Sequence, residues 1–119
     1  MYGLDGLDSK LSFLIGKEII QIAIGVHDVQ IRYQNGAISV WSSFLLKLPT
    51  GRKLQWVAGN PEDARELVAL LDSAIAQVRC SATDVAIRFA NDCELILCDP
   101  DPQFESFSIA EENKPLIIV

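Results

Sequence analysis

The chain repeats itself at a fixed spacing of 56 residues. When the sequence is shifted by 56 positions, residues 14–40 lie over residues 70–96 with eight identical pairs. The pairs are Leu14/Leu70, Ile19/Ile75, Gln21/Gln77, Asp28/Asp84, Val29/Val85, Ile31/Ile87, Arg32/Arg88 and Asn35/Asn91. Shared sequence at a fixed offset indicates one supersecondary unit used twice. The repeat therefore predicts a single domain, residues 1–119, built from two copies at about 8–58 and 60–119 that are related by a pseudo-two-fold axis.

Each copy is predicted to begin with a helix. Asn60 is a good N-cap and Pro61 suits the first helical position of the second helix. In the first copy, Asp8 or Ser9 can cap a shorter helix, and Gly16 can end it. Apolar residues spaced by three and four predict the buried stripes: Ala64, Leu67, Val68 and Leu71 in the second helix, and Leu11, Leu14 and Ile15 in the first.

Alternation of apolar and polar residues predicts five strands in each copy. The ranges are 20–24, 29–33, 37–41, 44–47 and 53–57, then 76–80, 85–89, 93–98, 104–109 and 116–119. In the first strand of each copy the pattern assigns Ile20, Ile22 and Ile24, and then Ala76, Val78 and Cys80, to the core face. Asn35-Gly36 predicts a type I′ hairpin. We therefore expect an α+β fold with two helices and one or two mostly antiparallel sheets.

The net charge of −6 is concentrated near the C-terminus. Residues 1–89 contain nine acids and nine bases, whereas the remaining residues contain seven acids and one base, Lys114. The seven acids are Asp92, Glu94, Asp99, Asp101, Glu105, Glu111 and Glu112. Such a region repels nucleic-acid phosphates and attracts basic surfaces. It predicts a basic protein partner and no nucleic acid, and an acidic end that only aids solubility is the alternative.

The termini and the cysteines bear on the compartment. The N-terminus has no basic start followed by an apolar run, so no secretory signal is predicted. The apolar runs are too short for a membrane helix. Three cysteines without a CxxC pair suggest reduced thiols. These features predict a cytoplasmic protein that does not contact a membrane.

No catalytic, cofactor or metal motif is present, so we expect a protein that is not an enzyme. His27 lies in a predicted turn, where it could act as a base or ligand, but Thr83 takes its place in the second copy. Cys93 and Cys98 are five apart on one strand, so they lie on opposite faces and cannot share a metal. Cys80 falls in the core pattern and is predicted to be an inert buried thiol.

Arg32 and Arg88 form an outward-facing pair related by the repeat. If the axis brings them together, they could bind a carboxylate or phosphate. The alternative is that each pairs locally, with Asp28 or Asp84, and stabilises an exposed strand face.

The acidic, proline-rich segment after residue 98 is predicted to bind a partner, because rigid loops with acids beside aromatics make good recognition surfaces. The predicted contact residues are Asp99, Asp101, Phe104, Glu105, Glu111 and Glu112. The alternative is that Phe104 and Phe107 are buried strand residues.

Several segments resemble a group of small bacterial proteins: Met1-Tyr2-Gly3-Leu4, Asp28-Val29-Gln30-Ile31, Asn35-Gly36 and Glu105-Ser106-Phe107-Ser108-Ile109. In size and acidity that group is similar to the immunity proteins that neutralise toxins delivered between bacteria. The resemblance implies a cytoplasmic binding protein and carries over no catalytic residue. We therefore expect an immunity-type inhibitor of a basic toxin. The alternatives are a small-anion or small-ligand domain with a site at the repeat axis, and a structural homo-oligomer, such as a homodimer, that pairs through a sheet edge such as residues 116–119.

Overall fold

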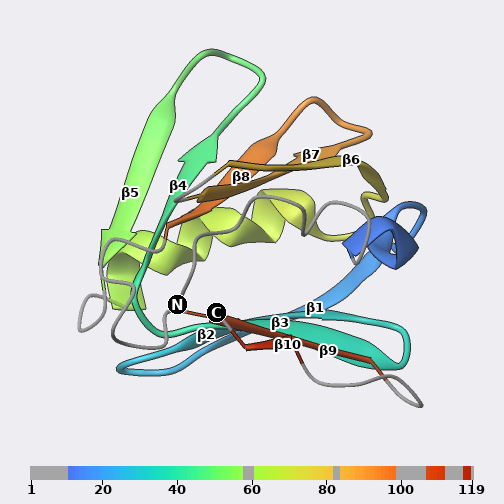
Figure 1. Ribbon diagram of the computed structural model, residues 1–119. Coiled ribbons are helices and arrows are strands. Elements are labelled where there is room, and N and C mark those ends of the chain that lie inside the picture. The colour runs from blue at the N-terminus through green and yellow to red at the C-terminus, as the bar shows by residue number, and fades with distance from the viewer. Residues whose placement is uncertain (1–10, 58–60, 82–83, 99–106, 112–116, 119) are drawn as a thin grey trace.

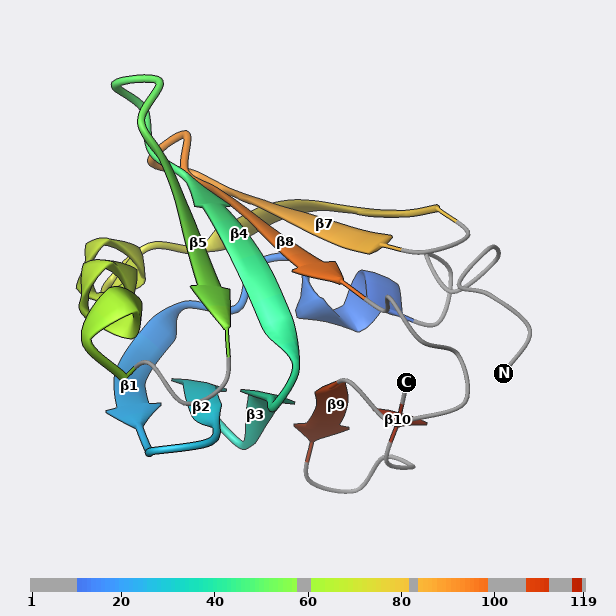
Figure 2. The same ribbon diagram turned by 90° about the vertical axis from the view of Figure 1, so that its left-hand side faces the viewer.

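The computed structural model describes residues 11–57, 61–81, 84–98, 107–111 and 117–118. Within these ranges the chain forms two five-stranded antiparallel sheets that face each other across a buried core (Figures 1 and 2). The first half contains η1 (Ser12–Leu14), β1 (Ile19–Ile24), β2 (Val29–Tyr33), β3 (Gly36–Val40), β4 (Ser43–Lys47) and β5 (Lys53–Val57). The second half contains η2 (Pro61–Leu70), β6 (Ile75–Cys80), β7 (Asp84–Phe89), β8 (Glu94–Cys98), β9 (Phe107–Glu111) and β10 (Ile117–Ile118).

The two halves are intertwined. The first sheet has the order β1-β2-β3-β9-β10, and the second has the order β5-β4-β8-β7-β6. Each half therefore contributes three consecutive strands to one sheet and its last two strands to the other. The same exchange in both directions is what a pseudo-two-fold axis between the copies requires.

The expected α+β class with two helices is wrong, because the described structure is mostly β. The first predicted helix is a 3-10 turn of three residues, and only η2 is a longer helical segment. From residue 64 onward, where the side chains of η2 are described, the buried residues are Ala64, Leu67 and Leu70, and a 3-10 helix aligns residues that are three apart. Val68 and Leu71, which the α-helical spacing placed on the buried stripe, are 57% and 41% exposed.

A β-bulge also corrects the predicted core face of the first strand in each copy. The pairing register shifts between Ile19 and Gln21 in β1, and between Ile75 and Gln77 in β6. A bulge places one extra residue in the strand and changes which side chains face the core. As a result Ile19 and Ile75 are buried, whereas Ile20 is 62% exposed. Ala76, the counterpart of Ile20, is also exposed.

The halves are joined near the axis by backbone hydrogen bonds that obey the repeat. Gly16 (φ +92°) and Asp72 (φ +64°) both adopt a left-handed conformation. Their N–H groups donate to the carbonyls of Ile75 and Ile19 at 2.7 and 2.8 Å. A second related pair runs from Ile75 N–H to Lys17 O at 2.9 Å and from Ile19 N–H to Ser73 O at 3.1 Å. Each bond is thus the 56-residue image of another.

The β2–β3 hairpin differs from the predicted type I′ turn. Its loop consists of Gln34 and Asn35, and Gly36 is already paired with Tyr33 in the ladder. Asn35 has φ +70°, but Gln34 does not have a positive φ, which a type I′ turn requires at both central positions. The corresponding loop between β7 and β8 is one residue longer, because Arg88 pairs with Glu94. Beyond the hairpin the two copies are therefore offset by 57 residues.

The core lies between the sheets and includes both helical segments. Leu11 and Leu14 from η1 and its start, and Leu67 and Leu70 from η2, are completely buried. Trp56 is also buried and stacks on Phe44 with ring centroids 5.2 Å apart. Of the helical segments in the described ranges, neither has the length and apolarity needed to cross a membrane.

Candidate functional site

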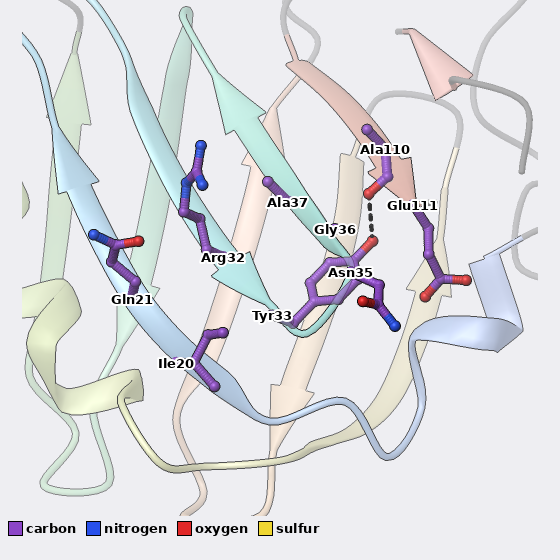
Figure 3. Close-up of a pocket in the computed structure, with 9 residues that line it drawn as sticks. All are labelled: Ile20, Gln21, Arg32, Tyr33, Asn35, Gly36, Ala37, Ala110 and Glu111. Carbon is purple, nitrogen blue, oxygen red and sulfur yellow. Dashed lines mark hydrogen bonds between the residues drawn. The ribbon is translucent and has the colours of Figure 1, made fainter. Parts of the chain in front are cut away.

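A cavity of about 650 Å³ opens at the end of the first sheet, around the β2–β3 hairpin (Figure 3). We call it the hairpin cavity. Its lining comes from β1, β2, β3, β9 and the hairpin loop: Ile20, Gln21, Arg32, Tyr33, Asn35, Gly36, Ala37, Ala110 and Glu111.

Arg32 occupies the outer face of the sheet beside this cavity. Val29, Ile31 and Tyr33 alternate inward along β2, so Arg32 is directed away from the core. Its Nε and Nη2 donate to the side-chain oxygen of Gln30 at 3.2 and 3.1 Å. No carboxylate among the described residues forms an ion pair with Arg32. The guanidinium is therefore held on one edge and remains positively charged without a neutralising partner in this part of the chain.

Tyr33 lies at the end of β2, with its side chain on the inner face of the first sheet. Its hydroxyl donates to the carbonyl of Ala110 at 2.8 Å (Figure 3). The ring lies against Gly36, where an added Cβ would come within 2.5 Å of a ring carbon and would overlap the Ala110 carbonyl. Glycine is therefore required at position 36 for the close approach of Tyr33 to β9.

Glu111 and Lys17 complete this inner side. Lys17 Nζ lies 2.8 Å from Glu111 Oε1, and the two side chains are 32% and 7% exposed. Among the described residues, no donor has the geometry for a hydrogen bond to Oε1 of Glu111. The contact between Lys17 and Glu111 is therefore an ion pair without a hydrogen bond. Lys17 Nζ also lies 5.9 Å from the centre of the Tyr33 ring. Burial, together with the negative charge of Glu111, raises the pKa of the Tyr33 hydroxyl far above its ordinary value.

The equivalent position in the second copy provides an internal comparison. Phe89 takes the place of Tyr33, Ser73 that of Lys17, and Cys93 that of Gly36. Leu48, which follows the Lys47–Glu94 pair, replaces Glu111 and packs against the core. Burial raises the pKa of the Cys93 thiol, which keeps it neutral. In the second copy the same position is thus filled without a charged pair.

This difference marks the first-sheet end as the candidate functional site. A buried ion pair contributes little net stability, because desolvation opposes the attraction. The fold does not need one here, since the second copy does without it. The polar side chains of Lys17, Tyr33 and Glu111, with Gly36 beside them, therefore depart from the repeat in a way that the fold does not explain.

Of the six predicted contact residues, the structure describes only Glu111. Asp99, Asp101, Phe104, Glu105 and Glu112 lie outside the described residues. Glu111 belongs to the hairpin cavity, and its side chain is largely buried against Lys17. The role of Glu111 as a contact charge stays a prediction. Phe107 is a buried strand residue, as the alternative proposed.

Arg32 and Arg88 do not converge. Arg32 lies on the outer face of the first sheet, and Arg88 lies on the outer face of the second, on the other side of the core. Arg88 Nη2 is 3.9 Å from Asp92 Oδ1. The predicted joint anion site at the axis therefore does not form. The predicted local partners Asp28 and Asp84 are not the observed ones either, since Gln30 and Asp92 take these roles.

The other titratable candidates lie away from the hairpin cavity. His27 is exposed in the turn between β1 and β2. Cys93 is buried, and Cys80 is half-buried at the end of β6. Nowhere in the described ranges do three metal-ligating side chains gather.

Comparison of the chain with models of protein families, with curated proteins and with solved structures finds no match.

Sequence reasoning missed Lys17, Tyr33 and Gly36 as parts of a site. The signal was present in the repeat itself. Tyr33 lies over Phe89 and Lys17 over Ser73, so a hydroxyl and a charge each occur in only one copy. In a duplicated unit, a polar residue found in one copy alone is a stronger functional signal than the identities shared by both, because shared residues are kept for the fold.

Proposed function

We propose that this chain is an immunity-type binding protein, which acts in the cytoplasm and blocks a basic bacterial toxin by covering its active surface. Inhibition would arise from steric exclusion, and complementary charge would speed the association of the two proteins.

The observation that carries this proposal is the distribution of charge over the chain. The side chains that the structure describes contain equal numbers of acids and bases. The acids are Glu18, Asp28, Glu66, Asp72, Asp84, Asp92, Glu94 and Glu111, and the bases are Lys17, Arg32, Lys47, Arg52, Lys53, Arg65, Arg79 and Arg88. The net charge of −6 therefore belongs to the remaining segments. Residues 99–106 and residue 112, which belong to these segments, contribute four acids and no base.

A charge excess confined to a few segments favours recognition over mere solubility. Charge that serves solubility can be spread over a whole surface. An excess concentrated in such segments is instead suited to electrostatic steering, which would raise the rate of association with a positively charged partner.

The proposal is tested by measuring association with purified basic nuclease toxins by biolayer interferometry at low and high salt. One toxin is expected to bind, with a rate that falls as salt increases. Asp99→Lys combined with Asp101→Lys should slow association about tenfold at low salt, because charged rim residues act mainly on the association rate.

The matched control combines Glu18→Lys with Glu66→Lys, which changes the net charge by the same amount on the sheet-and-helix body. This control should retain a rate close to that of the unaltered chain. Equal slowing in both double variants would mean that only total charge matters. Absence of binding to every basic toxin would also contradict the proposal.

A further inference from the structure

The outer face of the second sheet carries a row of charges that neutralise one another. Gln77, Arg88, Glu94 and Lys47 lie opposite one another on four neighbouring strands. Glu94 is within 3.5 Å of Lys47 and within 3.8 Å of Arg79, and its side chain is 18% exposed. A carboxylate is thus fixed on the strand next to Arg88, among three cationic side chains.

The first sheet has the corresponding row, but alanines occupy two of its four positions. Gln21 and Arg32 are retained, and they continue in register into Ala37 on β3 and Ala110 on β9. Alanine stands in the places of Glu94 and Lys47. Both alanines line the hairpin cavity beside Arg32 (Figure 3). The cavity therefore opens where the other sheet holds an acidic and a basic side chain.

Arg32 is also oriented in a way that Arg88 is not. Gln30 binds its Nε and Nη2 with one oxygen, whereas the counterpart of Gln30 in the second copy is Ala86. The hold on that edge leaves the Nη1 group and the outer edge of the guanidinium available. An oriented guanidinium can bind a carboxylate through two parallel hydrogen bonds, and less freedom is lost on binding when the group is already positioned.

We propose that the hairpin cavity binds the carboxylate of a small organic acid, with Arg32 as the anchor. The ligand carboxylate takes the role that Glu94 has on the second sheet. The body of the ligand packs on Ala37 and on Ile20, which the bulge leaves 62% exposed. The side-chain amides of Gln21 and Asn35 add hydrogen-bonding groups to the wall. A volume of about 650 Å³ lies within the range of small-molecule sites.

The charge balance of the cavity favours one negative charge on the ligand. Glu111 lines the same cavity, and its own charge is already opposed by Lys17. Arg32 is the one cationic residue in the described lining, and it has no carboxylate partner among the described residues. A second negative charge on the ligand would therefore find no partner and would be repelled by Glu111. The site should accept a monocarboxylate in preference to inorganic phosphate.

The test is an NMR titration of the full chain that follows the arginine side-chain Nε–Hε signals. Benzoate should shift the Arg32 signal saturably, while benzamide, of the same shape but neutral, and inorganic phosphate should not. A blocked aspartate presents the same group as an acidic protein side chain. Tighter binding of benzoate than of blocked aspartate assigns the site to free acids, and the reverse order assigns it to the side chain of a protein.

Three variants make the result specific. Ala37→Glu places on β3 the carboxylate that the second sheet has beside Arg88, and it should abolish benzoate binding while the chain stays folded. Arg32→Gln should also abolish binding. Arg88→Gln is the matched control and should bind benzoate as the unaltered chain does. Saturable binding that persists in Arg32→Gln or Ala37→Glu, or an equal response to benzamide, would overturn the proposal. This test does not involve a toxin, so its result is independent of the proposed inhibitor function.

Discussion

Replacing Lys17 by methionine removes the positive charge opposite Glu111 and keeps most of the side-chain volume. At 2.8 Å and an effective dielectric constant of about 20, the attraction within the pair is about 6 kcal/mol. Desolvation of the two groups offsets most of that attraction. Once Lys17 is gone, the carboxyl group of Glu111 has no cation opposite it, and its side chain is only 7% exposed. The expected loss in the free energy of unfolding is about 3 kcal/mol, the range for breaking a buried pair.

The reverse replacement is milder. Lys17 is 32% exposed, so in Glu111→Leu its ammonium group can turn toward water, and the expected loss is about 1 kcal/mol. The double variant, Lys17→Met with Glu111→Leu, imitates the apolar seal of the second copy and should lie within about 1 kcal/mol of the unaltered chain. The two single effects therefore should not add, and the coupling between them should be about 4 kcal/mol.

Urea unfolding followed by tryptophan fluorescence measures these differences, because Trp56 is completely buried in the folded chain. Lys47→Met is the matched control. Lys47 lies 3.5 Å from Glu94 in a pair that is 39% and 18% exposed, and Arg79 remains beside Glu94, so its loss should cost less than about 1 kcal/mol. A Lys17→Met effect no larger than this control, or additive single effects, would refute the assignment of a buried, charge-dependent pair.

Three further outcomes are expected. Burial and Glu111 raise the pKa of Tyr33, so the contribution of its hydroxyl to stability is complete below the ordinary tyrosine pKa of about 10 and declines above it by about 1.4 kcal/mol per pH unit. Alkaline denaturation of Tyr33→Phe should lack this decline. In the unaltered chain the tyrosinate absorbance of Tyr33 should appear only on unfolding. Gly36→Ala should lower the free energy of unfolding by about 2 kcal/mol or more in urea denaturation, because the new methyl group overlaps the Tyr33 ring and β9; an effect below about 0.5 kcal/mol would show that this contact is loose. Thermal unfolding should show a loss of about 3 kcal/mol for Leu67→Ala and less than about 1 kcal/mol for its neighbour Val68→Ala, whereas an α-helical stripe predicts large losses at both.

The repeat made the strand pattern predictable. The structure has a strand at or overlapping each predicted range; the ranges 29–33 and 53–57 match at both ends, and the other ends that lie within the described residues differ by at most two residues. Alternation determines which residues lie in strands, since it depends on one face being buried. It could not determine how strands pair across the two halves. Both a separate sheet for each copy and the exchanged arrangement bury the same residues, so the hydrophobic pattern is equal for the two.

The errors have local causes that period counting does not detect. A bulge moved Ile20 to the surface and left Ile19 in the core. The helical segment η2 uses a repeat of three residues, so Leu70 is buried in place of Leu71. One extra residue in the second hairpin shifted the correspondence of the copies beyond it. Each is a change of one residue, and in a strand such a change turns the side chain to the opposite face.

The candidate site was less predictable than the fold. Arg32 was identified from its exposed position and its match with Arg88, but the two belong to opposite surfaces. The partners of Arg32 depend on which strands adjoin β2 and β3, and Ala110 reaches the cavity only because β9 crosses into the first sheet. Lys17 and Glu111 are 94 positions apart in the chain, so no spacing rule joins them.

The exchanged hairpins bear on how such a molecule could arise. A single ancestral unit of about half this length would hold three strands of one sheet and a hairpin with no sheet of its own to complete. Two identical units of this kind could complete each other's sheets by exchanging hairpins, so the same fold is open to a symmetric dimer of half-length chains. In a single chain the two copies can differ, which the identical subunits of a dimer cannot do. The Lys17–Glu111 pair is one such difference.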